Sequence, residues 1–540
     1  MEQVGPCIRV ALEKMHLDEL RTTQLVLLVI MSVGLGYITL TVACNLLFSP
    51  LRHFPGPKIA ALTKWWELYH IIRCDKFKVI HDLHRTHGPV VRVGPNYLSF
   101  SSPEFFRQVY VKKCSTFLKD HELYSNIQPG LGPKYAGLFN FTDHQQALDE
   151  RKHLQAKLSP AALRQYELRF LPILSSLVNI MREKRELDLF MYLYVLTSLA
   201  RVLVSNVRCQ SISKFLMLDA IGDLAFDQSF HQLESGEEHQ YVVDFNNAFM
   251  LIGLQTTFSW LIPLIPILPF KKLKDSHYGL QRVFKYAQSR VNAFLNEKTP
   301  KPGTLMEAYL DGGKPKPPYS AWYIALSGHG FIVAGSESTS ITLTYVIWLL
   351  IKHPNIQRRL RDEIKSAPEG YTGADLASLP LLDAVLKETL RIYPPAPSPM
   401  PRVVPPGGAE FEGVQYPPNP SRAKTVIAAQ PYTIHRDADL FPNPEVFNPD
   451  RWLDASPERR ELMNRAFVPF SAGHRGCIGR GLALLHMQLA VAKILEEFDG
   501  FELTRGMTDE DMELVERGAL AKPKSTRLWV RAYPKAASSQ

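Results

Sequence analysis

Residues Phe470–Gly479 read FSAGHRGCIG, and an amphipathic run that begins near Gly481 follows at once. A cysteine at the end of a glycine-rich loop and the start of a helix lies where the helix dipole and free backbone N–H groups stabilise a thiolate. A thiolate in that place is suited to bind a metal. A lone cysteine among glycines is more often a small buried apolar residue, so the interpretation depends on the residues around Cys477.

The full spacing F-x-x-G-x-R-x-C-x-G supplies those residues. Gly473 and Gly479 would let the backbone pass close to a flat cofactor, where a Cβ would collide. Arg475 could pair with a carboxylate of that cofactor. The pattern therefore indicates a loop that holds a flat, acidic, metal-containing cofactor.

This decapeptide resembles the haem-binding loop of the cytochrome P-450 superfamily. The resemblance implies that Cys477 is the axial ligand of the iron of haem b, with Phe470, Gly473 and Arg475 also at the cofactor. In that family the thiolate donates electron density that favours O–O cleavage. The chain has no C-x-x-C-H sequence, which argues against covalent haem attachment of the c type.

Two further segments match the family in its usual order. The sequence ETLR from Glu388 to Arg391 resembles the E-x-x-R motif, whose two charged residues share one face of a helix. The family's third partner is an arginine that resembles Arg451 in NPDRW, where Asp450 replaces the usual glutamate. We expect Glu388, Arg391 and Arg451 to support the cysteine loop structurally and to take no part in the chemistry.

The hexapeptide AGSEST that begins at Ala334 resembles the family's oxygen-activation motif A-G-x-[DE]-T. Ala334 and Gly335 would open a groove for O2 beside the iron, and an acid followed by an alcohol can relay protons to it. Ser338 stands where the family usually has threonine, and Thr339 comes directly after it. The predicted catalytic set is therefore Glu337, Ser338 and Thr339, with the identity of the working hydroxyl left open.

Haem propionates need cations, and the resemblance assigns two arginines to them. Arg402 matches the arginine that follows E-x-x-R in the family. Arg151 resembles the arginine of the W/H-x-x-x-R helix, but Ala147 lies four residues before it and His144 falls one turn too early. We interpret His144 as a surface histidine.

The rest of the chain predicts a mainly α fold with a small β lobe. Val90–Val93 and Tyr97–Phe100 flank Gly94-Pro95-Asn96, which is typical of two strands joined by a turn. Helical periodicity covers Phe331–Lys352, Leu379–Tyr393 and Gly481–Phe498. This agrees with the cytochrome P-450 fold that the resemblance implies.

The N-terminal region predicts a membrane anchor. Leu25–Leu47 is apolar and carries no charged side chain, which provides the roughly 20 residues that a helix needs to cross a bilayer. Residues 1–24 form a short tail, residues 48–57 a Pro/Gly hinge, and residues 58–540 the haem-thiolate domain. A cleaved signal peptide is the alternative, but the run is too long and no small-residue cleavage site follows it.

Composition excludes several other classes of protein. The net charge is +9 and the pI about 9.0, but the basic residues are spread among acids, so we expect no nucleic-acid partner. The six cysteines form no C-x-x-C pair and no compact framework, which indicates a reducing cytosol rather than a disulfide scaffold or a structural zinc site.

The resemblance extends from about Pro55 to about Val530 and is narrower in places. Several segments are similar to fungal benzoate para-hydroxylase-like enzymes and their secondary-metabolism relatives. Residues 191–214 lengthen the chain where the family runs almost directly into its next helix, and residues 417–424 replace an expected P-x-G-T turn. Our hypothesis is that the first insertion, and the second on weaker grounds, is a retained intron or gene-model error, which transcript sequencing that reads straight through both would refute.

The function that this implies is insertion of one atom of O2 into a small lipophilic substrate, by hydroxylation or epoxidation, as a tailoring step in fungal secondary metabolism. Demethylation and desaturation stay open. Electrons would come from a separate NADPH-cytochrome reductase in the endoplasmic reticulum membrane, with the catalytic domain facing the cytosol, because the chain carries no flavin or nicotinamide fingerprint. The alternatives are a haem-thiolate isomerase or dehydratase and a non-catalytic membrane-anchored haem binder.

One more apolar segment has two interpretations. Phe258–Phe270 is rich in proline and large apolar side chains. It either dips into the bilayer beside a substrate entrance or forms a buried part of the core.

Overall fold

The computed structural model describes residues 28–29, 31–36, 39–111, 116–127, 137–189, 212–226, 229, 231, 240–296, 303–311, 314–316, 318–411, 413–418, 424–518 and 520–535. The helices are η1 (Cys44–Phe48), α2 (Lys58–Leu62), α3 (Trp65–Ile72), α4 (Lys76–His87), α5 (Pro103–Phe106), η2 (Arg107–Val111), α6 (His121–Asn126), α7 (His144–Gln155), η4 (Ala156–Leu158), α8 (Pro160–Lys184), α9 (Ile212–Phe226), α11 (Gln240–Thr257), η5 (Ser259–Ile267), α12 (Lys271–Asn296), η6 (Met306–Tyr309), α13 (Ala321–Lys352), α14 (Pro354–Lys365), α15 (Gly373–Ala377), α16 (Pro380–Ile392), α17 (Pro431–Ile434), α18 (Asp450–Leu453), α19 (Pro457–Ala466), η7 (Gly473–Arg475) and α20 (Arg480–Glu497). The strands are β1 (Val90–Gly94), β2 (Tyr97–Phe100), β3 (Leu118–Lys119), β4 (Glu186–Asp188), β5 (Leu310–Asp311), β6 (Lys314–Pro315), β7 (Arg402–Val403), β8 (Ala409–Phe411), β9 (Val414–Tyr416), β10 (Val426–Ala429), β11 (Phe498–Leu503), β12 (Leu514–Arg517), β13 (Leu520–Pro523) and β14 (Trp529–Pro534).

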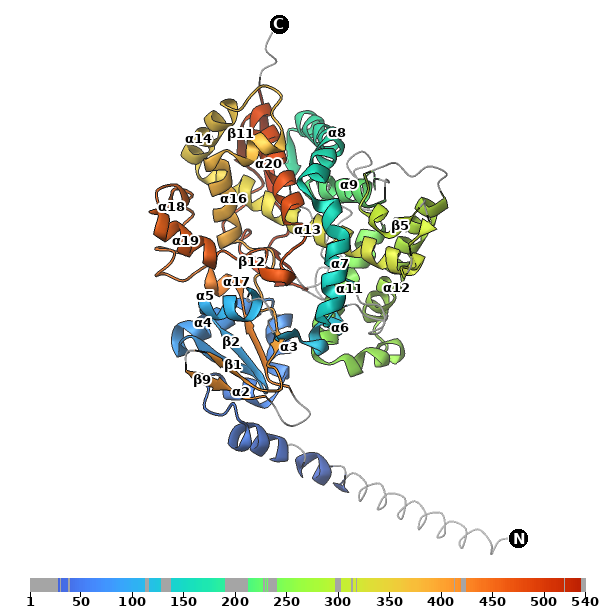
Figure 1. Ribbon diagram of the computed structural model, residues 1–540, viewed down its shortest axis with the longest axis vertical. Coiled ribbons are helices and arrows are strands. Elements are labelled where there is room, and N and C mark those ends of the chain that lie inside the picture. The colour runs from blue at the N-terminus through green and yellow to red at the C-terminus, as the bar shows by residue number, and fades with distance from the viewer. Residues whose placement is uncertain are drawn as a thin grey trace, which may run out of the picture.

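Helix α13 runs through the middle of the helical part of the molecule (Figure 1) and packs against α9, α12, α16 and α20. Its N-terminus is capped by Ser320, whose side chain accepts a hydrogen bond from the Tyr323 N–H. Most of its residues are buried, as expected for a helix that is apolar nearly all round. The predicted segment Phe331–Lys352 is the C-terminal two thirds of this helix.

The β lobe lies beside the helical part and near the N-terminal end of the described chain (Figure 1). Its main sheet has the strand order β1-β2-β10-β7-β3. β1 and β2 pair antiparallel with Val90 opposite Phe100, which confirms the predicted hairpin, and β10 adds to β2 in parallel. The sheet therefore brings β3 and β7, which are nearly 300 residues apart in sequence, side by side.

The other two helix predictions agree with the structure to within one residue at each end. α16 spans Pro380–Ile392, and α20 spans Arg480–Glu497. Both have a buried apolar face and end where a residue leaves the helical conformation, at Tyr393 and at the extended Phe498. α16 carries the E-x-x-R motif, and α20 directly follows the cysteine loop.

The N-terminal helix matches the predicted anchor in part. Met31–Phe48 is, by length and composition, a helix long and apolar enough to cross a membrane. The segment predicted as a hinge is held against the lobe, because the Arg92 side chain donates to Asn45 O and Ser49 Oγ, and the Arg92 N–H donates to Pro55 O. The predicted tail, most of the insertion at 191–214 and the central part of 417–424 lie outside the described residues.

Candidate active site

The cysteine loop ends directly at the N-terminus of α20. The Cys477 N–H donates to Phe470 O at 2.8 Å, which closes the loop, and the Cys477 side chain is exposed. Burial of the surrounding region raises the pKa of the Cys477 thiol, while the backbone N–H groups of Gly479 and Arg480 and the charge of Arg151 lower it. The N–H groups at the helix start therefore favour the thiolate as predicted, but burial outweighs them and the pKa is raised overall.

Gly473 is required for a reason besides the predicted one. Its φ is +67°, and a Cβ at this position would lie 2.2 Å from Tyr110 O. The close approach within the protein is therefore to the backbone of η2, and the expected approach of this glycine to a flat cofactor stays a prediction. Among the glycines that the structure describes, Gly479 is the one where an added Cβ would lie near Cys477 Sγ, 4.0 Å away.

Three cations lie close together near the loop: Lys119 of β3, Arg402 of β7 and Arg475 of η7. Lys119 Nζ donates to Phe139 O at 2.6 Å, and Arg402 Nη1 donates to the Tyr124 hydroxyl at 3.1 Å. Arg475 Nη2 donates to Asp143 O at 2.8 Å, but its Nη1 is buried and has no hydrogen-bond partner. These partners in the described chain are carbonyl oxygens and a phenol, none of them charged.

The pKa values of these groups record their mutual repulsion. Burial lowers the pKa of Lys119 well below its ordinary value, and the charges of Arg402 and Arg475 lower it further. Burial and the charge of Arg402 lower the pKa of Arg475 to about 10. Buried positive charges without a counter-charge are costly, so this cluster is suited to an anionic ligand.

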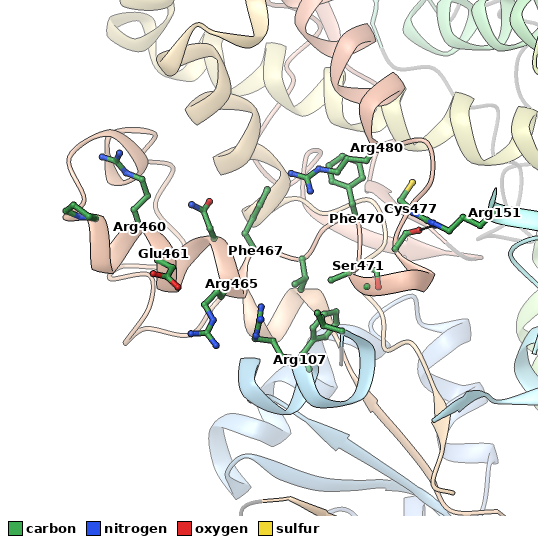
Figure 2. A pocket seen from close by; sticks show the side chains of 18 residues that line it. Arg107, Arg151, Arg460, Glu461, Arg465, Phe467, Phe470, Ser471, Cys477 and Arg480 are labelled. Carbon is green, nitrogen blue, oxygen red and sulfur yellow. Dashed lines mark hydrogen bonds between the residues drawn. The ribbon is translucent and has the colours of Figure 1, made fainter. Parts of the chain in front are cut away.

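Arg151 binds the backbone of the cysteine loop, because its Nη1 donates to Gly476 O at 2.6 Å (Figure 2). Burial and the charges of Arg475, Arg402 and Arg151 lower the pKa of His474 to about 4, so Arg151 lies near the other two arginines. His144, predicted to be a surface histidine, is half-buried and contacts the His474 ring, with ring centroids 4.0 Å apart. His144 therefore keeps part of its side chain at the surface, as the interpretation requires.

The AGSEST segment presents different residues to different neighbours. Ala334 is exposed, and Ser338, one turn later, donates to Ala334 O at 2.7 Å. Thr339 is buried, and a Cβ on Gly335 would lie 2.8 Å from Ile221 Cδ1 of α9. Gly335 therefore permits packing against α9, and Ser338 is the hydroxyl on the exposed face, while the O2 groove beside Ala334 and Gly335 stays a prediction.

Glu337 points to a third neighbour. Its Oε1 accepts a hydrogen bond from Lys522 Nζ of β13 at 2.6 Å. Both side chains are almost fully buried. Glu337, the acid predicted to relay protons, is thus held in an ion pair with the hairpin of β12 and β13 near the C-terminus.

The structure brings the predicted E-x-x-R triad together. Glu388 accepts from Arg391 Nη2 at 2.8 Å and from Arg451 Nε at 2.9 Å, and it also accepts from Trp452 Nε1 at 2.9 Å. Arg391 is fully buried and also donates hydrogen bonds to the carbonyl oxygens of His435 and Pro444. This network joins α16 to the segment that leads to the cysteine loop.

A hollow of about 720 Å³ lies on one side of the cysteine loop (Figure 2). Apart from a single glutamate, Glu461, the charged side chains that line it are arginines: Arg107, Arg151, Arg460, Arg465 and Arg480. The surface beside the loop is therefore strongly basic.

Comparison with protein-family models gives a match to cytochrome P-450 over residues 55–530. The chain belongs to this family. A cytochrome P-450 monooxygenase of Aspergillus terreus is 30% identical over 88% of this chain and 92% of its own length. Averantin hydroxylase of Dothistroma septosporum is 32% identical over 93% and 91%, and tryprostatin B 6-hydroxylase of Aspergillus fumigatus is 30% identical over 84% and 76%.

The residues present fit the haem that the P-450 family implies. Cys477 is exposed at a helix start, and the unpartnered Arg475 Nη1 lies within a group of buried cations that lacks a charged partner in the described chain. A thiolate ligand and cations for two propionates are what a haem requires. Sequence reasoning had missed Lys119, Tyr124 and Lys522, because a single polar residue in a short strand (β3, β13) or a short helix (α6) carries no signal of its distant partners.

Proposed function

We propose that this P-450 monooxygenase hydroxylates a small lipophilic intermediate of fungal secondary metabolism. The observation that carries the proposal is the occurrence of an exposed Cys477 together with the cationic group of Lys119, Arg402 and Arg475, in which the buried Arg475 Nη1 has no hydrogen-bond partner. The names of the averantin and tryprostatin B hydroxylases favour hydroxylation over epoxidation. The benzoate para-hydroxylase-like placement stays a prediction.

Haem b, bound through Cys477, supplies activation of O2 with electrons from NADPH. Lys119, Arg402 and Arg475 would hold its propionates, and Arg151 would fix the loop through Gly476 O. The Glu388–Arg391–Arg451 network holds the segment before the loop in place. In this proposal none of these three residues touches the reacting atoms.

Proton supply falls to α13. Ser338 lies on the exposed face with Ala334, and Glu337 is its neighbour in sequence. We assign the hydroxyl of Ser338 to hold a proton at the oxygen-binding side, and Glu337 to resupply it. The buried Thr339 would support the helix and would not donate the proton.

The membrane arrangement is part of the same proposal. Met31–Phe48 would anchor the chain in the endoplasmic reticulum membrane with the catalytic domain on the cytosolic side. Trp260 and Ile267 of η5 are 65% and 77% exposed, which overturns the alternative of a buried core segment. Trp65 of α3 lies against Phe258, so α3 and η5 form one apolar face that would contact the bilayer.

The basic hollow would receive the NADPH-cytochrome reductase. Its five arginines line a hollow that extends from the cysteine loop, where Arg151 and Arg480 lie, to α19, so an acidic flavoprotein domain that docks there comes close to Cys477 (Figure 2). Charge reversal by Arg465→Glu should raise the reductase concentration needed for half-maximal NADPH oxidation about tenfold at low salt. An unchanged requirement would place the docking surface elsewhere.

The deciding experiment is the absorption spectrum of the reduced, CO-bound protein in microsomes, with Cys477→Ala as the control. The wild type should show the long-wavelength Soret band that is characteristic of thiolate-ligated haem, and the variant should lack it. A wild type without that band, in a folded sample, would contradict the proposal.

A further inference from the structure

A buried ion pair joins the predicted proton relay to the C-terminal hairpin. Lys522 Nζ lies 2.6 Å from Glu337 Oε1, and the two side chains are 2% and 7% exposed. Lys522 belongs to β13, which pairs with β12, and the Ala521 N–H donates to Pro395 O in the loop after α16. The hairpin is therefore fixed against the body of the protein, and it brings a cation to one defined point on α13.

A pair of this kind is poorly explained by stability alone. Desolvation of two charges largely cancels their attraction, and a well-packed apolar pair of similar volume is often as stable or more so. On α13, which is mostly apolar, Lys522 pairs with the acid of the AGSEST segment, Glu337. Its placement points to a role for the charge of Glu337.

The geometry separates the acid from the exposed face of the helix. Successive residues of a helix are about 100° apart around its axis, so Glu337 and Ser338 face different neighbours. Ser338 is bonded to Ala334 O on the exposed face, and Glu337 is directed to β13. The Glu337 carbonyl is also occupied, because it accepts a hydrogen bond from Ser340 Oγ at 2.9 Å.

We infer that Lys522 is a positioning residue for proton delivery, which holds the Glu337 carboxylate at the junction of α13 and the β12–β13 hairpin. This rests on the proposed function of Glu337. In each cycle Glu337 takes up one proton that originates in bulk solvent, passes one proton toward Ser338, and returns to its carboxylate form. Lys522 keeps its own proton throughout and touches neither haem nor substrate.

The test uses full-length holoenzyme reconstituted with an NADPH-cytochrome reductase in phospholipid vesicles. Two rates are compared: reduction by the reductase under CO, which needs no proton delivery, and NADPH oxidation in air, which does. Lys522→Met should keep the thiolate Soret band and the reduction rate within about twofold. It should lower NADPH oxidation about tenfold and enlarge the solvent isotope effect in D2O.

Three further variants separate positioning from a structural role. Lys522→Arg should restore most of the NADPH oxidation, and Lys524→Met, which alters an exposed lysine two residues away, should behave as wild type. Glu337→Gln should lose as much as Lys522→Met, and the double variant should be no slower than Glu337→Gln alone. The double variant buries no unpaired charge, so this comparison stands even if Lys522→Met fails to fold.

The outcomes that overturn the inference are specific. Lys522→Met with wild-type NADPH oxidation and isotope effect would do so, as would losses that multiply in the double variant. A Lys522→Met protein that slows both rates equally would show a structural role only. A wild type that lacks the thiolate band or oxidises no NADPH would instead refute the proposed function itself.

Discussion

Lys119 shows how the cost of burying one side chain can identify a ligand. Its ammonium donates to Phe139 O and lies 4.3 Å from the centre of the Tyr124 ring, with Arg402 and Arg475 as charged neighbours. A haem propionate would supply the missing counter-charge. Lys119→Met should therefore speed haem transfer to apomyoglobin about tenfold or more, as expected for loss of a charge-assisted hydrogen bond. Lys152→Met, at an exposed position of α7, should change the transfer rate little, and equal rates in both variants would contradict the assignment.

The lowered pKa of Lys119 predicts that the stability of the haem-free protein depends on pH. Because the pKa of Lys119 is lowered in the folded state, the folded chain binds fewer protons than the unfolded chain between the folded and unfolded pKa values. The free energy of unfolding should rise with pH through that window, up to the ordinary lysine pKa. Lys119→Met should show a smaller rise in urea unfolding measured across the same pH series. Parallel curves for the two proteins would count against a depressed pKa.

Glu388 makes the opposite case, since here a buried carboxylate pairs directly with the cations around it. It accepts hydrogen bonds from Arg391 and Arg451 in a site from which water is excluded. Glu388→Gln would leave buried arginine charge without a partner and should lower stability by about 3–5 kcal/mol, measured as loss of the thiolate band on mild heating. Asp450→Asn breaks only the partly exposed pair with Arg359 and should cost about 1 kcal/mol or less. Similar losses in both variants would argue against a special role for Glu388.

At the scale of elements, local patterns predicted the helices and the first hairpin well. α16 and α20 begin and end within a residue of the expected bounds, because apolar periodicity and the flanking residues act locally. The start of α13 was placed ten residues late, since the pattern between Ala321 and Gly330 contains two glycines and a histidine that burial tolerates. Tertiary packing, which no local pattern records, decided that boundary.

The glycines of the site show the same limit. Gly473 and Gly335 were predicted from their spacing, but their neighbours, Tyr110 O and Ile221, come from distant segments. Sequence reasoning could therefore find the positions but not the physical reason for them. For Lys522 it could find neither, because the partner Glu337 lies 185 residues away.

Gly473 allows a test of this reason. Gly473→Ala places a Cβ 2.2 Å from Tyr110 O at a positive φ, so η2 or the cysteine loop must move. We expect loss of most of the thiolate Soret band in the reduced, CO-bound protein. Gly413→Ala is the matched control, because its φ is +75° and nothing lies within 4 Å of the new Cβ. It should cost only about 1–2 kcal/mol and keep the band. A normal band in Gly473→Ala would contradict the overlap.

At the scale of the whole molecule, the apolar face of α3 and η5 lies at the same end of the protein as the N-terminal helix, and α8 lies at the other (Figure 1). Trp65, Trp260 and Ile267 are all more than half exposed, although the transfer of apolar side chains of this size out of water is favourable. Two separate attachments to the membrane would fix the orientation of the domain, whereas one helix would leave it free to turn. The face should therefore bind lipid without the anchor.

A variant that lacks residues 1–48 tests this directly. It should still co-sediment with neutral phosphatidylcholine vesicles, because the apolar face needs no charged headgroup. The double substitution Trp260→Ser and Ile267→Ser in that variant should weaken the binding about tenfold or more, since burial of each such side chain contributes about 1.5–3 kcal/mol. Leu168→Ser, at an equally exposed apolar position on α8, should leave binding unchanged. If the truncated protein stays in the supernatant, or if all three variants bind alike, the face is not a membrane contact. The N-terminal helix would then be the proposed attachment to the membrane.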